Sequence, residues 1–179
     1  MYYTGPGTKR LYIRPLTKDD IPVWAEYFTY PEATRFISQF FPSTDPYKIS
    51  EDFIGKQFLR YAENRYGHQA LIHKTTGEFM GVCGLLLQNI QGVNEIEIGY
   101  HLFPKFWHRG YATEASQHFR DFAFHNKLTT SIISVIDTEN YASQNVAIRN
   151  GMTQERKFPF GGSDHYIYRI TREEWEIIK

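Results

Sequence analysis

The stretch EIEIGYHLFPKFWHRGYATEA, residues 95–115, contains a strand, a short loop and the start of a helix. Polar and apolar residues alternate over 95–102, which indicates a half-buried strand. Apolar residues then recur at helical spacing and predict a helix over 111–125. The first amides of a helix attract anions, and Gly110 lets a phosphate approach the backbone. We expect a pyrophosphate site there; a glycine that only serves the turn is the alternative.

The rest of the chain supplies the elements around this unit. Strands are predicted at 11–16, 69–73, 78–88 and 131–137, and a final hairpin at 155–158 and 165–171. Helices are predicted at 18–29, 45–64, 143–150 and 172–179, and a short helix with a loop over 30–45. The order β-α-α-β-β-β-α-β-α-β-β indicates a mixed α/β domain with a largely antiparallel sheet. We expect a single domain over 1–179, in which residues 1–8 are loose.

Local signals mark where several elements begin or end. Pro15 favours an edge strand or a strand end, because proline cannot donate a ladder hydrogen bond. Thr17 precedes Asp20 by three residues, as in a capping box with Asp in place of Glu. Asp45 followed by Pro46 is a favourable helix start, since proline suits the first turn.

The bulk composition excludes several classes of protein. The chain has 179 residues, of which 41% are hydrophobic, and its 20 Lys and Arg balance its 20 Asp and Glu. General nucleic-acid binders and proteins of acidic membranes usually carry a basic excess, which is missing here. No apolar run approaches the length of a membrane span, and the N-terminus lacks the features of a signal peptide. We expect a soluble cytoplasmic protein, either a monomer or a homodimer.

The cysteine and histidine content indicates neither a disulfide nor a metal site. The one cysteine, Cys83, lies in the apolar run MGVCGLLL (80–87), which favours a small buried residue over a reactive thiol. The seven histidines show no spacing typical of metal ligands. We therefore expect no bound metal.

The segment WHRGYATEA, residues 107–115, resembles the acetyl-CoA loop of the GNAT N-acetyltransferase superfamily. That loop has the pattern Gln/Arg-x-x-Gly-x-Gly/Ala, in which Gly110 and Ala112 fill the last two places and Trp107 replaces the first. Trp often stands there in the subgroup of ribosomal-protein N-terminal (RimJ/RimL-like) acetyltransferases. The chain is similar to that subgroup in further motifs that occur in the same order, namely EIGY (97–100), N-x-x-S (140–143), NGM (150–152), DHYIY (164–168) and EEW (173–175).

The resemblance implies a GNAT-like fold, in which two neighbouring parallel strands of a helix-flanked sheet splay apart. Acetyl-CoA would enter the gap as a co-substrate. Its pantetheine arm would pair with the backbone of the strand near Leu102 and Phe103, like an added strand. Its pyrophosphate would lie on the loop formed by His108, Arg109, Gly110, Tyr111, Ala112 and Thr113. His108 stands where the family commonly has Gly.

Amine acetylation requires that the amine lose a proton, that the thioester carbonyl be polarised and that the departing thiolate be protonated. Glu95 and Glu97 share one face of their strand, because alternate side chains point the same way. The resemblance places Glu97 near the splay, where it would take the amine's proton directly or through a water. The alternative is a solvent-exposed sheet face that carries two carboxylates.

Asn140 and Ser143 follow the strand at 131–137. The resemblance implies that Asn140 bonds the arm of the co-substrate and that Ser143 lies close to its sulfur. Many members have a Tyr acid seven residues after this Asn, but here that residue is Ala147. Ser143 or a bound water would then protonate the thiolate. The alternative role of Ser143 is to cap the helix that begins there.

The sequence leaves the amine acceptor open. Relatives that acetylate ribosomal proteins place a Glu base beyond the Ser, in a region where this chain has only Asp164. The resemblance implies an acceptor site between the first two helices and the final hairpin, for a protein N-terminus or a small amine. A direct N-acetyltransferase is the main hypothesis, and an acetyl-CoA sensor without turnover is the alternative.

Overall fold

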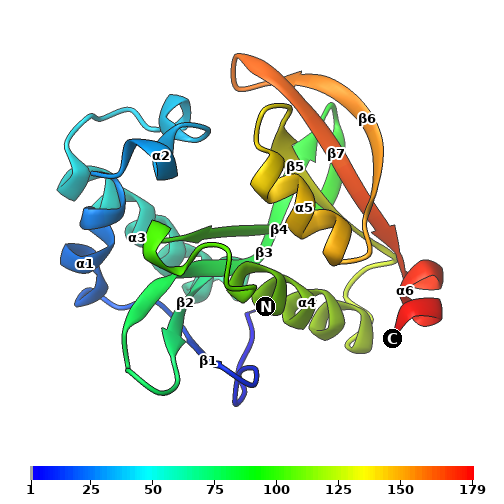
Figure 1. Cartoon of the computed structure of the whole chain (residues 1–179), viewed down its shortest axis with the longest axis horizontal. Helices are drawn as coiled ribbons and strands as arrows, with labels where there is room; N and C mark the ends of the chain where they lie inside the picture. Colours follow the sequence, from blue (N-terminus) through cyan, green and yellow to red (C-terminus); the bar gives the residue numbers. More distant parts are fainter. Residues whose placement is uncertain (1) are drawn as a thin grey trace.

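Residues 2–179, which this computed structural model describes, form one seven-stranded sheet with helices on both faces (Figure 1). Its strands, in the order in which they neighbour one another, are β1 (Leu11–Arg14), β2 (His68–His73), β3 (Phe79–Ile90), β4 (Val93–Leu102), β5 (Ser131–Asp137), β7 (Ser163–Thr171) and β6 (Thr153–Phe160). Neighbouring strands are antiparallel except β4 and β5, which run parallel. The predicted mixed, mostly antiparallel α/β fold is confirmed.

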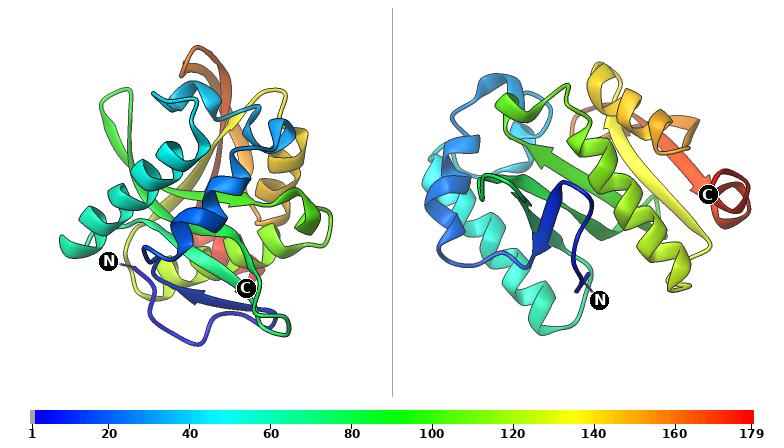
Figure 2. Two further views of the ribbon diagram at one scale, coloured as in Figure 1. Left: turned by 90° about the vertical axis from the view of Figure 1, so that its left-hand side faces the viewer. Right: turned by 60° about the horizontal axis from the view of Figure 1, so that its bottom comes forward.

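The helices lie on the two faces of this sheet (Figures 1 and 2). One face is covered by α1 (Asp20–Tyr27) and α3 (Pro46–Ala62), and the other by α4 (Tyr111–His125) and α5 (Tyr141–Arg149). The shorter elements are α2 (Pro31–Thr34), α6 (Arg172–Ile178) and the 3₁₀ turns η1 (Ser38–Phe40) and η2 (Pro104–Phe106).

Two of the predicted boundaries have the physical basis that the sequence indicated. The edge strand β1 ends at Arg14, directly before Pro15. Helix α3 begins with Pro46 in its first turn, and the Asp45 carboxylate accepts hydrogen bonds from the Tyr47 and Lys48 amides at 2.9 and 3.4 Å. An oxygen at this place satisfies amides that have no partner within the helix.

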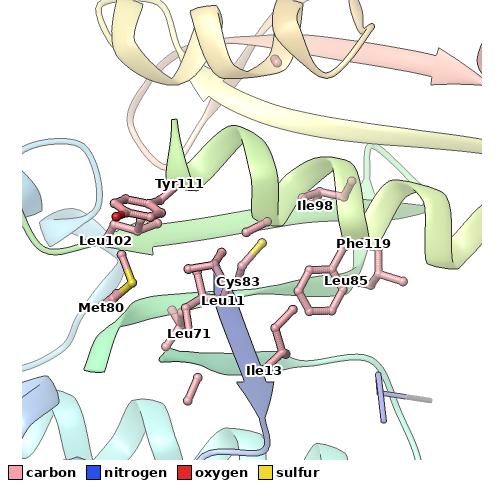
Figure 3. Close-up of a cluster of buried hydrophobic side chains, with 14 of the residues drawn as sticks. Leu11, Ile13, Leu71, Met80, Cys83, Leu85, Ile98, Leu102, Tyr111 and Phe119 are labelled. Carbon is pink, nitrogen blue, oxygen red and sulfur yellow. The ribbon is translucent and has the colours of Figure 1, made fainter. Parts of the chain in front are cut away.

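The main core lies between the sheet and α4. The predicted helix over 111–125 is confirmed, and its apolar stripe of Ala115, Phe119 and Ala123 is buried. Figure 3 shows Tyr111 and Phe119 of α4 among the buried side chains of the strands. Because alternate residues of a strand point to opposite faces, Ile98 points toward α4 and Glu97 points away from it. Glu97 therefore lies on the face that α1 and α3 cover.

The parallel strands β4 and β5 meet and then separate. In the described residues their ladder is limited to the position where Glu97 lies opposite Ile133. The Ser134 hydroxyl continues the contact by donating to the Ile98 carbonyl at 3.0 Å. Toward its end β4 pairs only with β3 and β5 only with β7, so the two strands diverge (Figure 1). This split is the predicted splayed strand pair.

The sequence analysis expected residues 1–8 to be loose, but the part of this segment that the structure describes makes specific contacts. Met1 lies outside the described residues, but Tyr3 donates its backbone N–H to the Gln69 side chain at 2.7 Å and accepts from it at 2.8 Å. The Tyr3 ring also packs edge-on against Phe122, with ring centroids 5.3 Å apart. Gln69 is fully buried, and a buried amide requires such partners.

The capping box predicted at Thr17 is only half formed. Asp20 accepts from the Thr17 amide at 2.7 Å, as the box requires. The Thr17 hydroxyl, however, donates to the same carboxylate at 3.2 Å instead of accepting from a helix amide. Arg14 binds that carboxylate with two nitrogens, each at 2.7 Å. Asp20 therefore joins β1 to α1 through a bidentate ion pair.

Candidate functional site

The edge of β4 that faces the split presents backbone groups. The Phe103 amide donates to the Met80 carbonyl of β3 at 3.0 Å. Because hydrogen-bonded and non-hydrogen-bonded pairs alternate along antiparallel strands, Tyr100 and Leu102 turn their backbone groups the other way, toward the split. An extended ligand chain can pair with such an edge as an added strand.

The two residues predicted to pair with a pantetheine arm lie differently. Leu102 faces the split, although its carbonyl already accepts the Trp107 indole N–H at 2.7 Å. Phe103 turns its amide toward β3, and its buried ring packs on Trp24 with centroids 6.0 Å apart. Tyr100 and Leu102 are thus the better placed pair. The Trp107 bond also fixes the loop to the end of β4.

Glu97 lies at the apex of the split, where β4 and β5 part. Its carboxylate is 8% exposed and accepts hydrogen bonds from Gln88 Nε2 at 2.7 Å and from the Val135 amide of β5 at 3.3 Å. Burial raises the pKa of Glu97 to about 7, although both hydrogen bonds favour the charged form. A carboxyl with this pKa can accept a proton near neutral pH and release it again.

Glu95, two residues earlier on the same face, is bound by a cation. Its two carboxylate oxygens lie 2.7 and 3.1 Å from two nitrogens of Arg169 on β7. The side chain is 14% exposed. The two carboxylates therefore do not form the solvent-exposed face that was the alternative interpretation. Glu95 ties β4 to β7, and Glu97 alone of these two has no cationic partner among residues 2–179.

The sheet face next to Glu97 holds neutral groups. Burial lowers the pKa of His101 to about 4 and that of His68 well below its ordinary value. Neither ring nitrogen of His68 has a hydrogen-bond partner in the described chain. A Cβ on Gly99 would lie 2.9 Å from His68 Nε2, so this position requires a glycine. Both imidazoles are neutral at pH 7, and neither supplies a positive charge beside Glu97.

Helix α5 approaches the other wall of the split. It begins at Tyr141, two residues earlier than predicted, because its cap is Asn140 and not Ser143. The Asn140 side-chain oxygen accepts from the Ser143 amide at 3.1 Å. Tyr100 reaches across from β4 and donates its phenol O–H to the Ser143 carbonyl at 3.0 Å. The Asn140 amide nitrogen has no partner in the described part of the chain, whereas the Ser143 side chain interacts with the Tyr100 phenol.

The loop from β4 to α4 turns through two left-handed residues. His108 has φ 58° and Gly110 has φ 77°, a region that favours glycine. A glycine adopts this φ without strain, which fits the resemblance that puts a glycine at the position of His108. Helix α4 begins at Tyr111 without a side-chain cap, and its first bond runs from the Glu114 amide to the Gly110 carbonyl at 3.0 Å. The amides of Tyr111, Ala112 and Thr113 therefore have no intrahelical acceptor.

Comparison with known proteins agrees with this geometry. The family model described as an acetyltransferase (GNAT) domain matches residues 10–153. The chain belongs to the GNAT acetyltransferase family.

Among the relatives of this GNAT protein, one bears the name of an N-acetyltransferase, and a solved acetyltransferase structure shares the fold. The uncharacterised Bacillus subtilis protein YkkB is 39% identical over 79 residues, which are 44% of this chain and 46% of that protein, or about half of each. The N-acetyltransferase p20 of Bacillus licheniformis is 30% identical over 138 residues, 76% of this chain and 75% of that one. A solved structure of RimL, a ribosomal L7/L12 α-N-protein acetyltransferase in complex with coenzyme A, has a TM-score of 0.74 at 18% identity and covers 93% of this chain and 96% of its own.

This GNAT protein lacks a tyrosine where many members have their acid. Ala147 occupies that place on α5 and is 1% exposed. Because alanine has no hydroxyl, this position supplies no proton donor to the split. The Tyr100 phenol reaches the N-terminal turn of α5 from the opposite wall instead. The sequence analysis quoted Tyr100 within a motif but gave it no role. The only sequence signal for Tyr100 was its position in the same strand as Glu97, three residues further on.

A second group of residues that the sequence did not single out surrounds the loop. Arg10, the residue before β1, donates Nη1–H to the Arg109 carbonyl at 2.9 Å. Its Nε pairs with Glu114, in the first turn of α4, at 2.5 Å. Arg10 and Glu114 are 104 positions apart in the chain, so no local pattern could have joined them.

A pocket of about 450 Å³ lies beside the β6–β7 turn. One wall comes from the segment after α1, another from the end of β5 and the third from the β6–β7 turn, and the lining residues include Arg35, Phe36, Gln39, Asp137, Glu139, Gly161 and Asp164. Arg35 and Glu139 form an exposed ion pair at 2.6 Å. Asp164 pairs with Lys157 at 2.7 Å.

Residues 2–179 contain neither a cluster of metal-binding side chains nor a membrane-spanning helix. No group of three or more His, Cys, Asp or Glu side chains in this range is arranged to hold a metal ion. No helix in this range is long and apolar enough to cross a membrane.

Proposed function

We propose that this protein transfers an acetyl group from acetyl-CoA directly to a primary amine. The observation that carries the proposal is the buried Glu97 carboxyl, with a pKa of about 7, at the apex of the split. GNAT family members use acetyl-CoA, and the available edge of β4 and the uncapped N-terminus of α4 suit the two parts of that molecule.

The donor would bind along the split. Its pantetheine arm would pair with the backbone of Tyr100 and Leu102, and its pyrophosphate would accept hydrogen bonds from the loop that includes Gly110. The unpartnered amide nitrogen of Asn140 would donate to the arm from the α5 side. His108 and Arg109 are exposed at the rim of the loop, where solvent and phosphate both have access.

The transfer would then proceed in one ternary complex. The amine passes a proton to Glu97, directly or through a water, and its nitrogen forms a bond to the acetyl carbonyl carbon. The carbon–sulfur bond breaks as the tetrahedral intermediate collapses, the thiolate takes a proton from the Ser143 hydroxyl or a water, and that oxygen is reprotonated by the proton that the nitrogen loses as it becomes the amide. Cys83 is fully buried, and burial raises the pKa of its thiol well above the ordinary range, so a covalent acetyl-cysteine is not part of the proposal.

The acceptor would approach through the pocket near the β6–β7 turn. Glu139 and Asp164 of this pocket are already paired with Arg35 and Lys157, so Asp137 is the lining carboxylate that would favour a cationic primary amine, either a protein N-terminus or a small amine. Asp137 lies four residues beyond the β5 position opposite Glu97, which is about 13 Å along a strand. An acceptor that extends from the pocket to Glu97 would therefore need a reach of this order.

One observation favours a second candidate, an acetyl-CoA sensor without turnover. Ala147 is buried at the place of the usual tyrosine acid, so one catalytic group of the family is missing. A sensor would need the donor site and would not need Glu97 as a base.

The deciding experiment is release of free CoA thiol from acetyl-CoA over a panel of amines, with product mass measured in parallel. The proposal expects thiol release that depends on an amine and on Glu97, so that Glu97→Gln lowers it and Glu95→Gln, measured below its melting temperature, does not. Binding of acetyl-CoA without amine-dependent release would favour the sensor. No binding of acetyl-CoA at millimolar concentration would overturn both.

A further inference from the structure

Arg10 contacts the phosphate-loop region at three points. Its Nε pairs with Glu114 at 2.5 Å, its Nη1 donates to the Arg109 carbonyl at 2.9 Å, and its guanidinium carbon lies 4.1 Å from the centroid of the Tyr111 ring. Tyr111 is held in turn by His73 Nε2, 3.1 Å from its phenol oxygen. Three groups of the loop and the first turn of α4 are thus fixed by one side chain from the residue before β1.

The bond to the Arg109 carbonyl falls between the two left-handed residues of the loop, His108 and Gly110. In a trans peptide the carbonyl and the following N–H point in opposite directions. Because Arg10 holds the Arg109 oxygen, the Gly110 amide must point away from Arg10. That amide is the first of the donors that an anion at this helix start would meet.

The pairing with Glu114 has a second effect. A carboxylate in the first turn of a helix competes with an anionic ligand for the same positive helix end. Glu114 accepts from the Thr8 hydroxyl and from the amide and Nε of Arg10, so it is drawn toward the N-terminal segment. Partial burial opposes its ionisation, but these bonds lower the pKa of Glu114 below the ordinary value. The charge is therefore present, and Arg10 offsets it.

We propose that Arg10 is a positioning residue for the pyrophosphate of the donor. It orients the Gly110 amide through the Arg109 carbonyl and offsets the Glu114 carboxylate beside the phosphate site. This inference rests on the proposed function, because it assumes that the loop holds the pyrophosphate of CoA. Arg10 acts through the loop and Glu114, and it makes no contact with the reacting atoms.

The test compares Arg10→Gln with Lys9→Gln, which removes the same charge one residue earlier from an exposed side chain without a partner in the described chain. CoA affinity is measured by titration calorimetry, and acetyl transfer is measured with acetyl-CoA and with S-acetylpantetheine, which has no pyrophosphate. Arg10→Gln is expected to weaken CoA binding about tenfold or more. It should leave transfer from S-acetylpantetheine close to that of Lys9→Gln. Melting temperatures show that both variants are folded.

A double variant tests the offset of charge. Glu114→Gln in the Arg10→Gln background removes the unpaired carboxylate, so part of the lost CoA affinity should return, and the salt dependence of binding should change with it. No recovery would overturn the role of Glu114, and equal CoA binding by the Arg10 and Lys9 variants would overturn the proposal as a whole. So would an equal loss with both donors in Arg10→Gln, since that indicates general damage. A wild-type protein that binds no CoA would instead contradict the proposed function.

Discussion

The donor side of the split and its acceptor side hold their residues in place by different means. On the donor side, the loop before α4 is fixed by Trp107 to the end of β4 and by Arg10 to the N-terminal segment. On the acceptor side, the pocket walls are joined by exposed pairs such as Arg35 with Glu139, whose side chains are 62% and 65% exposed. Exposed pairs of this kind contribute about 0–1 kcal/mol.

This difference suggests which half of the site can change. The donor contacts join the loop to the end of β4 and to the segment before β1, so altering them displaces the loop. The acceptor contacts are made by side chains on a loop and a turn, which can be replaced at small cost in stability. A family that keeps one donor and varies its acceptor would be expected to keep the first kind of contact and vary the second. Five expected outcomes test this difference between the two sides.

The largest effect is expected at Glu97, where the two sides meet. Glu97→Gln should lower turnover at neutral pH about a hundredfold, because no base remains to take the amine's proton. Raising the pH should restore part of the rate, since more of the acceptor is then already neutral. A pH–rate profile of both proteins with one good acceptor measures this. Wild-type rates in the variant across the whole range would remove Glu97 from the mechanism.

The Glu97 side chain should also lower the free energy of unfolding at neutral pH, and Glu97→Gln should restore it. Its folded pKa of about 7 lies above the ordinary 4.5, so the folded state holds the proton more tightly than the unfolded state. The resulting stabilisation is full below pH 4.5 and is lost as the pH rises to 7. Wild type should therefore lose stability relative to Glu97→Gln over this window, by about 3 kcal/mol at most. Urea unfolding at pH 5 and pH 8 measures the difference, and a constant gap would contradict a raised pKa.

The next largest effect is expected at Gly110, on the donor side. Gly110→Val should weaken CoA binding about tenfold or more, with the fold intact. The structure gives a conformational reason for this loss. An added Cβ would lie 3.6 Å from Arg10 Nη2, which is an ordinary contact, so the cost comes mainly from the φ of 77°. Gly110→Asn, which tolerates that φ better, should bind more tightly than Gly110→Val. Equal affinities of the two variants in calorimetry would show that backbone strain is not the cause.

Sequence patterns predicted elements with a local signal better than caps and contacts between distant residues, for physical reasons. Helix α4 and strand β5 have the predicted bounds, since apolar periodicity and β-branched runs are local signals. The alternative role of Ser143 as the cap of α5 is taken by Asn140, because both residues are good caps and only the backbone decides between them. The Glu95–Arg169 pair joins residues 74 positions apart, which no local pattern can reveal.

The acceptor side should respond in acceptor binding alone. A Cβ on Gly161 would meet the Phe40 ring at 2.2 Å, so Gly161→Ala should displace the segment around η1 and raise the KM for the acceptor severalfold. Gly162→Ala is the matched control, because its φ of 91° carries the same kind of strain and a Cβ there meets nothing within 4 Å. CoA affinity should be unchanged in both. A KM shift of the same size in both variants would show that the Phe40 contact has no role in the acceptor site.

The smallest effects are expected where α5 meets β4, and they decide which group protonates the thiolate. Ser143→Ala removes a hydroxyl that lies beside the Tyr100 phenol, and a water can replace it, so turnover should fall no more than about tenfold. Tyr100→Phe removes the hydrogen bond that the phenol donates to the Ser143 carbonyl, at a cost of about 1 kcal/mol in stability. The cost is small because this carbonyl lies in a helix and can keep its backbone donor.

The two variants therefore separate the two candidates for the acid. Burial raises the pKa of the Tyr100 phenol well above the ordinary value, which makes it a poor proton donor to a thiolate. Tyr100→Phe should accordingly change turnover less than Ser143→Ala, and raising the pH should rescue neither as it rescues Glu97→Gln. Single-turnover rates at saturating donor measure the chemical step without product release. A larger loss in Tyr100→Phe, with its stability near that of wild type and with Ser143→Ala at the wild-type rate, would instead assign the proton to the phenol, because a phenol that acted only through the Ser143 hydroxyl could not matter more than that hydroxyl itself.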